Sequence, residues 1–359
     1  MATKMLRPNV GIYVAAGDAF ADWKAPTLAE ITDPTKVFNI SQAVTDDYTL
    51  NQTESQSDNS LSIVDNADVT TPTYYNYEAS LDGFRDENLS ATSVYNKFRD
   101  LFKTADVKYY LIKRVGFEHD ASFVAGQEIS IFGVKTDFPT ELVGDGEMIR
   151  LGARFLTTGE VAVNVAIAAG TAGAGPELRT TVGTKSTSNG KIKVTWVPVA
   201  DVTNESVFLS DPDIAILNGD GIDLTAAIAW DGYDLGAQDS NKIDDRSIID
   251  EGQVQVRGFA QFSGSLTFFR ENDLEDTAGA YAIVREAFKA STDGSRPQGY
   301  LVTRINKPAA SAYIVGETVS VYKFIADAYM DNTEGEDSVK FMVNFAPQGK
   351  LGVMVQTND

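Results

Sequence analysis

The sequence predicts a mainly β fold made of two tandem repeats, each a β-sandwich or partial barrel with one helix. The first observation is that residues 74–86 alternate between apolar and polar side chains, as in a strand with one buried and one solvated face. The second is that this pattern returns in the second half of the chain, at 259–271. The residues that match between the two segments are Leu81 and Leu266, Phe84 and Phe269, and Arg85 and Arg270.

The similarity continues on both sides of this strand. The difference in position between matched residues grows in small steps, and the steps fall between predicted elements. We call the spacing from Leu81 to Leu266 the central offset and the slightly larger spacing from Gly126 to Gly316 the late offset. Insertions in loops produce such steps, so we interpret the chain as an internal duplication. Further matched pairs are Tyr13 and Trp196 in the opening strands, Tyr48 and Tyr233, Tyr95 and Tyr281, Phe102 and Phe288, and Gly159 and Gly349.

The duplication predicts a first repeat at 1–168, a linker and hairpin arm at 169–190, and a second repeat at 191–359. Small residues fill the segment 168–176, which is typical of a linker. Two β-branched runs around a polar turn predict a hairpin over 177–199. This hairpin is either an extra arm or a simple connector.

Each repeat has one predicted helix. The first covers 90–104, with a serine as its N-cap and one apolar stripe, and its counterpart covers 277–291. Long polar segments at 45–62 and 231–250 are predicted to be loops. The predicted strands are 9–16, 28–32, 37–44, 69–84, 108–117, 128–135, 148–155 and 160–167, followed by 193–199, 214–217, 222–230, 259–271, 299–305, 317–326, 338–345 and 350–356.

Composition narrows the class of protein. The 359 residues include 30 Lys and Arg against 51 Asp and Glu, a formal net charge of −21. Tight phosphate binding depends on clustered basic side chains, so a nucleic-acid-binding role is disfavoured. The N-terminus lacks the apolar stretch of a signal peptide, and no apolar run approaches a membrane span. We therefore expect a soluble protein made in the cytoplasm.

The residues needed for most catalytic chemistry are missing. The chain has no cysteine and a single histidine, His119, so the usual triads and transition-metal sites cannot be assembled. The acidic clusters at 211–213, 220–223 and 331–337 do not fit a twelve-residue calcium loop. We therefore predict no catalytic, cofactor-binding or metal-binding residues. An enzyme that uses paired carboxylates is the least favoured interpretation.

The phrase Leu81-Asp-Gly-Phe-Arg-Asp86, together with the element order of each repeat, resembles the major tail tube protein of long non-contractile-tailed (siphovirus-type) bacteriophages. The resemblance spans nearly all of both repeats. It implies two packed β-sheets flanked by a helix and a long loop. It also implies a structural virion protein without enzymatic activity, whose stacked rings form a hollow tail tube through which viral DNA passes.

The resemblance carries further expectations about partners. Members with one repeat form six-membered rings, so a duplicated chain is expected to form homotrimeric rings with pseudo-six-fold symmetry. Tape measure, tail terminator and baseplate proteins are the other expected partners. No cofactor is expected, and viral DNA is expected to pass without specific binding. The expected location is the virion tail, assembled in the host cytoplasm.

Two surfaces are candidate functional sites. The polar face of each central strand is the candidate channel lining, with ordinary outer surface as the alternative. Its residues are Asn76, Glu78, Ser80, Asp82, Gln261, Ser263, Ser265 and Thr267. The two polar loops are the candidate contacts between rings, through Asp46, Asp47, Glu54, Asp58, Asp239, Asp244 and Asp245.

Two other functions are compatible with the sequence. One is a surface adhesion protein built of two β-domains, which the missing export signal and missing aromatic pockets disfavour. The other is the tube protein of a contractile injection system, which shares the fold. Polymerisation would separate both tube hypotheses from an adhesin or an enzyme.

Overall fold

A computed structural model describes residues 9–59, 70–89, 92–144, 146–245, 253–270, 279–289, 295–327, 329–332 and 339–359. The chain divides into two compact units that exchange short segments. Unit 1 comprises Met1–Thr140, Arg150–Lys185 and Asp239–Gly258. Unit 2 comprises Glu141–Ile149, Ser186–Gln238 and Phe259–Asp359. A piece of the second repeat therefore belongs to unit 1.

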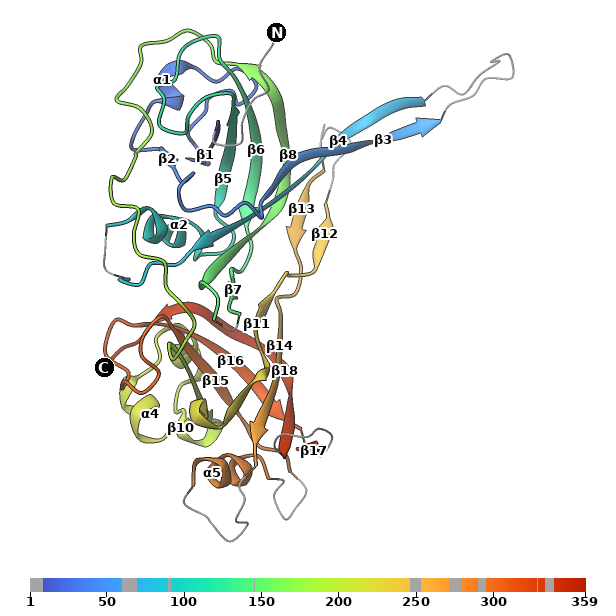
Figure 1. The fold of residues 1–359 in the computed structure, drawn as a ribbon. Coiled ribbons are helices and arrows are strands. Elements are labelled where there is room, and N and C mark those ends of the chain that lie inside the picture. Colours follow the sequence, from blue (N-terminus) through green and yellow to red (C-terminus); the bar gives the residue numbers. More distant parts are fainter. Residues whose placement is uncertain are drawn as a thin grey trace. The chain divides into compact units, whose positions relative to one another are not determined.

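Each unit is built on one antiparallel sheet (Figure 1). The strands of unit 1, in spatial order, are β2 (Val37–Asn39), β1 (Val10–Ala16), β5 (Lys108–Val115), β6 (Glu128–Thr136), β8 (Arg150–Ala166), β4 (Thr70–Phe84) and β3 (Thr49–Asn59). The strands of unit 2 are β10 (Ile222–Asp223), β9 (Ile192–Pro198), β15 (Gln298–Ile305), β16 (Thr318–Ala326), β18 (Lys340–Gln356), β14 (Gln261–Phe269) and β11 (Ile228–Gln238). The remaining strands are β7 (Thr140–Leu142), β17 (Met330–Asn332) and the separate pair β12 (Lys242–Asp244) and β13 (Gln255–Arg257).

The strand order is the same in both units, which confirms the predicted mainly β fold and its repetition. Residues that match at the late offset also share their backbone conformation. Gly126 and Gly316 both turn with positive φ, +85° and +80°, in the left-handed region that favours glycine. Asn164 and Met354, which match at the same offset, share a positive φ as well, +55° and +54°. Insertions between elements therefore left the backbone of the repeat intact.

Helices cover the sheets. In unit 1, Ser93 caps α2 (Val94–Phe102) by accepting a hydrogen bond from the amide of Asn96, as predicted. Its Phe98 and Phe102 rings pack edge to face and join Phe155 of β8. The matching helix of unit 2 is α5 (Ala280–Ala287), whose neighbour Phe288 packs on Trp196. Shorter helices are α1 (Leu28–Ile31), α3 (Glu205–Ser210), α4 (Ile214–Gly219) and the 3-10 turns Val199–Asp201 and Thr225–Ala227.

Two predicted strands are helices. The segment 28–32 is α1, which Thr27 and Glu30 start with a reciprocal capping box. The segment 214–217 lies in α4, where the carboxylate of Asp213 accepts from the amide of Ala215. Short apolar runs do not distinguish a buried strand from one turn of helix, and the capping residues are the signal that does.

The polar segments predicted to be loops are largely strands. β3 covers most of 45–62, and β12 and all of β11 after its first three residues fall in 231–250. Both β3 and β11 are edge strands whose polar side chains need no core, so their composition resembled that of loops. The predicted hairpin over 177–199 is also wrong. Its second arm is β9, whereas residues 179–182 form no strand.

The alignment of the opening strands was off by one residue. Tyr13 pairs with Ile112, and the residue that pairs with the matching Val302 is Thr195. Trp196 therefore points to the opposite face from Tyr13, toward the end of α5, because side chains alternate along a strand.

Candidate functional site

The polar face of β4 lies where the alternation predicted it. Tyr77 and Leu81 are buried, at 2% and 0% exposure, whereas Glu78 is exposed and Asn76 and Ser80 are half-buried. Asp82 departs from the pattern: it is buried and lies 2.7 Å from Nη1 of Arg154 on β8.

The matching face of β14 carries no charge. Phe262, Leu266 and Phe268 alternate with less buried polar residues along the strand. Gln238 donates to the Ser263 hydroxyl (2.9 Å), and Ser265 lies 3.1 Å from the Asn344 side-chain oxygen. The four predicted residues of this face are Gln261, which is exposed, and Ser263, Ser265 and Thr267, which are half-buried.

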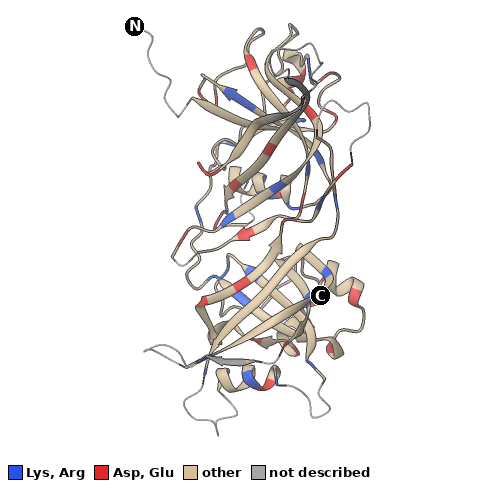
Figure 2. Cartoon of the chain, turned by 90° about the vertical axis from the view of Figure 1, so that its right-hand side faces the viewer, with Lys and Arg blue, Asp and Glu red and all other residues tan. Residues whose placement is uncertain are grey.

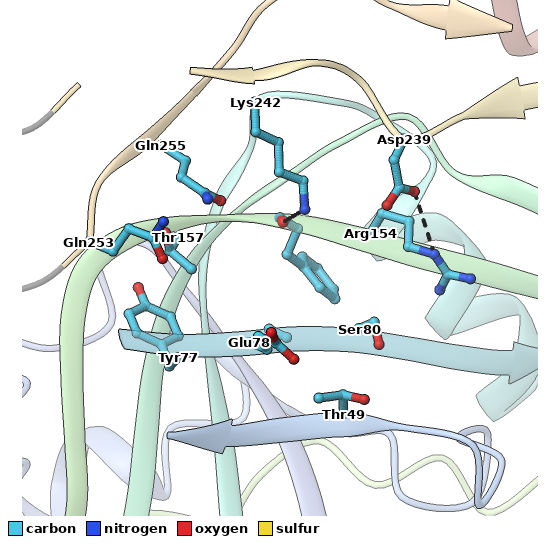
Figure 3. A pocket seen from close by; sticks show the side chains of 12 residues that line it. Thr49, Tyr77, Glu78, Ser80, Arg154, Thr157, Asp239, Lys242, Gln253 and Gln255 are labelled. Carbon is cyan, nitrogen blue, oxygen red and sulfur yellow. Dashed lines mark hydrogen bonds and ion pairs between the residues drawn. The ribbon is translucent and has the colours of Figure 1, made fainter. Parts of the chain in front are cut away.

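In unit 1, part of the polar face lines a pocket of about 340 Å³. Glu78 and Ser80 on β4 face Asp239 and Lys242, which reach toward β8 (Figure 3). The wall next to them is fixed by the Tyr77 hydroxyl, which donates to the carbonyl of Gly133 and accepts from the amide of Thr158 (2.9 Å). Burial raises the pKa of Tyr77 to about 12, so this phenol stays protonated.

The far wall of the pocket is the distal hairpin, which we define as residues 239–245 and 253–258 and which contains β12 and β13. It comes from the second repeat but packs in unit 1. The Asp137 carboxylate accepts from the amide of Ser240 (2.9 Å) and from its hydroxyl (2.7 Å). Lys242 donates to the carbonyl of Phe155 (3.2 Å), and Arg257 lies 2.5 Å from the carboxylate of Asp106.

Of the predicted loop residues, Asp239 lines this pocket. Asp239 pairs with Arg154, at 3.6 Å. Asp244 and Asp245 are exposed on the distal hairpin, and Gln253 donates to Asp244 (3.1 Å). Asp46 and Asp47 are exposed before β3, with Asp47 3.3 Å from Arg150. The side chains of Glu54 and Asp58 lie outside the described residues.

Asp137, Arg154 and Arg257 were not singled out by sequence reasoning. Their partners are far away in the chain, and no spacing rule links positions 103 or 151 residues apart. The available signal was the repeat itself, because the distal hairpin matches the far end of β3 and β4 at the central offset.

Charge and composition add no sign of a ligand site. Figure 2 shows Lys and Arg scattered among Asp and Glu over the described strands and loops. Within the described ranges, His, Asp and Glu side chains form no group of three or more that could hold a metal ion. None of the helices in the described part of the chain has the length and hydrophobicity to cross a membrane. The acidic cluster 331–337 lies outside the residues whose side chains are described.

Comparison with known families decides the identity of the fold. A family model described as phage tail tube protein matches the chain twice, over residues 1–170 and 180–357. The chain belongs to the phage tail tube protein family. The double match confirms a duplicated tube domain. A search of curated proteins found no match. This tail tube protein is thus a structural component of the virion tail that assembles with itself into a tube.

Proposed function

We propose that this protein forms the tube of a non-contractile, siphovirus-type tail, that its rings stack, and that viral DNA passes through the channel. The main support for this function is the repeated sheet with one polar face, in a chain that belongs to the tail tube family. A sheet with open edges tends to pair with another chain, and closing such sheets into a wide barrel leaves an aqueous channel.

The duplication supports a ring of three chains. Two tube domains per chain bring six to a ring, with approximate six-fold symmetry around a true three-fold axis. The predicted repeat boundaries, 1–168 and 191–359 around a linker and arm at 169–190, belong to this proposal. Contacts that do not close on themselves along the axis extend rings into a filament. We further propose assembly in the host cytoplasm with tape measure, terminator and baseplate proteins, and no enzymatic activity.

We also propose that the polar faces of β4 and β14 line the channel. The residues of these two faces are themselves neutral or acidic, with Glu78 and Asp82 in unit 1 as the acidic ones. A wall of neutral and acidic groups lets the polyanion slide, because such groups do not bind phosphates and displace their counterions as Lys and Arg do. Asn76→Lys, Ser80→Lys and Ser263→Lys together should leave tubes intact and slow DNA passage. Unchanged infectivity would argue for an outer surface.

The polar segments containing Asp46, Asp47, Glu54, Asp58, Asp239, Asp244 and Asp245 are our proposed contacts between rings. Shortening the segment 45–62 should give folded chains that no longer polymerise. Normal tubes from this variant would contradict that role.

Microscopy and light-scattering mass of the purified protein test the function itself. Striated tubes, or particles with the mass of three chains, are expected at high concentration. Assembly only in the presence of a sheath protein would favour a contractile injection system instead. Failure to assemble even with tail initiator proteins, combined with binding to a host glycan or protein, would favour an adhesin.

A further inference from the structure

Arg114 on β5 is a fully buried cation, with 0% exposure. Its Nη2 atom donates to the carbonyls of Glu118 (2.6 Å) and Ala121 (2.8 Å). Its Nε and Nη1 atoms are buried too, and among the described residues they have no hydrogen-bond partner. A guanidinium stays charged at any ordinary pH, so in a buried place it needs an opposite charge or further acceptors beside it.

The surroundings of this guanidinium are aromatic. The central carbon of Arg114 lies 4.2 Å from the ring centre of Phe123, 5.4 Å from that of Tyr13 and 5.5 Å from that of Phe117. Ring faces attract a cation but do not replace strong hydrogen-bond acceptors. Burial lowers the pKa of Arg114, and the charges of Tyr13 and Asp120 offset this only in part.

The second repeat supplies the acceptors at the same site. Arg304 matches Arg114 at the late offset, and its Nη1 atom donates to the carbonyl of Ala312 (2.9 Å) and to the carboxylate of Glu317 (3.1 Å). Lys307 donates to the same carboxylate (2.7 Å). The buried Glu317 therefore acts as an anion that unit 2 carries in its own sequence.

Unit 1 lacks both acceptors of that nitrogen. Gln127 stands in the place of Glu317, and its neutral side chain accepts from the amide of Val124 (3.2 Å). Ser122, which matches the other acceptor, receives no hydrogen bond from Arg114. The guanidinium is thus kept in both repeats, but the carboxylate that balances it is present only in the second.

A pocket of about 270 Å³ lies against this part of unit 1. Its lining includes Ala121 and Phe123, which both contact the Arg114 guanidinium, and Ser122 between them. The lining also includes Asp120, whose side chain is 53% exposed, so the pocket is connected to solvent. Solvent screens the exposed carboxylate, whereas the buried cation is screened much less.

We propose that Arg114 binds a small monovalent anion such as chloride, which takes the place that the Glu317 carboxylate has in unit 2. The anion reaches Nη1 from the pocket beside Ser122. A multivalent oxyanion is disfavoured, because a single guanidinium would leave its second charge buried without compensation. The site lies within unit 1 and does not depend on the assembly of a tube.

Hydrogen exchange of the intact protein tests this site. Chloride is titrated against methanesulfonate at constant ionic strength, so that screening of the net charge of −21 does not change. Protection of the β5 and β6 amides should rise by up to about tenfold for each tenfold rise in chloride above the dissociation constant, because the ion binds only the folded form. The amides of β15 and β16 in unit 2 should change far less.

Two exchanges between the repeats make the test specific. Gln127→Glu places a carboxylate beside Arg114, as in unit 2, and should abolish the chloride dependence of β5 and β6. Glu317→Gln removes the carboxylate from unit 2, where Arg304 and Lys307 remain. It should therefore create a chloride dependence in β15 and β16.

Two results would overturn the site. One is protection of β5 and β6 that does not respond to chloride, because the guanidinium would then be balanced without an anion. The other is an unchanged response in Gln127→Glu, because chloride would then act elsewhere. Crystals soaked in bromide give a second measurement that needs no variant. An anomalous peak beside Nη1 of Arg114 is expected, and bromide bound only at other places would contradict the proposal.

Discussion

The Asp137 carboxylate accepts hydrogen bonds from both the amide and the hydroxyl of Ser240, a residue 103 positions later. The amide of Phe138 donates to the same carboxylate (2.8 Å). Three donors and near-complete burial make this carboxylate the anchor of the distal hairpin. The amide of Asp137 donates to the carbonyl of Arg154 (2.9 Å), and its counterpart at the late offset, Asp327, donates in the same way to Asn344 (2.8 Å). The side chain of Asp327 is exposed, so the two positions form a natural comparison.

Asp137→Ala should destabilise unit 1 by about 2–4 kcal/mol, since buried donors lose their acceptor. The distal hairpin should detach first, which hydrogen exchange of residues 240–245 and 253–257 would detect. Asp327→Ala is the matched control and should change the free energy of unfolding of the single chain by less than about 0.5 kcal/mol. Equal effects of the two variants would contradict the anchoring role.

The contact between α2 and β4 predicts a coupled pair. A side chain at Gly83 would meet the Phe98 ring, with an ideal Cβ only 2.5 Å from it. Unit 2 has the opposite arrangement at the matching positions, with the large Phe268 on the strand and the small Val284 on the helix, both fully buried.

Gly83→Ala should therefore destabilise the protein by about 1–3 kcal/mol through overpacking, and Phe98→Val by about 2–3 kcal/mol through a cavity. The double variant should be less destabilised than the sum, by at least about 0.5 kcal/mol, because each change relieves the other. Chemical denaturation of all four proteins measures this coupling. If the losses of unfolding free energy in the two single variants simply add up in the double variant, the two positions do not compensate for each other in size.

A buried ion pair distinguishes unit 2 from unit 1 at one matched site. Arg304 lies 3.1 Å from Glu317, at 1% and 3% side-chain exposure, and also donates to the carbonyls of Pro308 and Ser311. The equivalent Arg114 keeps the carbonyl acceptors, but Gln127 stands in the place of Glu317.

Glu317→Gln gives unit 2 the arrangement of unit 1, so we expect a loss of only about 1–3 kcal/mol. Glu317→Ala also removes the acceptor of the Ile314 amide and should cost about 3–5 kcal/mol. Unfolding followed by the fluorescence of the buried Trp196 reports on this unit. An equal loss of unfolding free energy in Glu317→Gln and Glu317→Ala would contradict this role of the side-chain acceptor.

Glu205 predicts a pH dependence. Hydrogen bonds from Lys323 and Lys350 lower the pKa of this carboxyl to about 2. Because the folded pKa lies below the ordinary 4.5, the stabilisation is complete above about pH 4.5 and is lost as the pH falls toward 2.

Glu205→Gln should be about 0.5–1 kcal/mol less stable than the parent at pH 7, as expected for a partly exposed ion-pair network. The difference should shrink between pH 4.5 and 2, when the parent carboxyl becomes protonated. Thermal unfolding of both proteins across this range measures it, with Asp220→Asn as an exposed control. A difference that stays constant with pH would exclude the ion pairs as its cause.

Local patterns in the sequence were enough to predict the repetition, the β class and the polar face of the central strands. Alternation at Tyr77 and Leu81 and the cap at Ser93 are local signals, because side-chain direction and capping depend on neighbouring residues. The short helices were missed although Thr27 and Glu30 carried a local signal.

The register of the opening strands and the place of the distal hairpin depend on contacts between distant segments, so they became visible only in the folded chain. The register of β9 against β15 set Thr195, not Trp196, opposite Val302, and a slip of one residue reverses every side chain. The contact of Asp137 with Ser240 joins segments from different repeats, so its energy depends on how distant strands meet in space. Local pattern carries no information about such a contact, since a polar turn residue looks the same whether another segment covers it or water does.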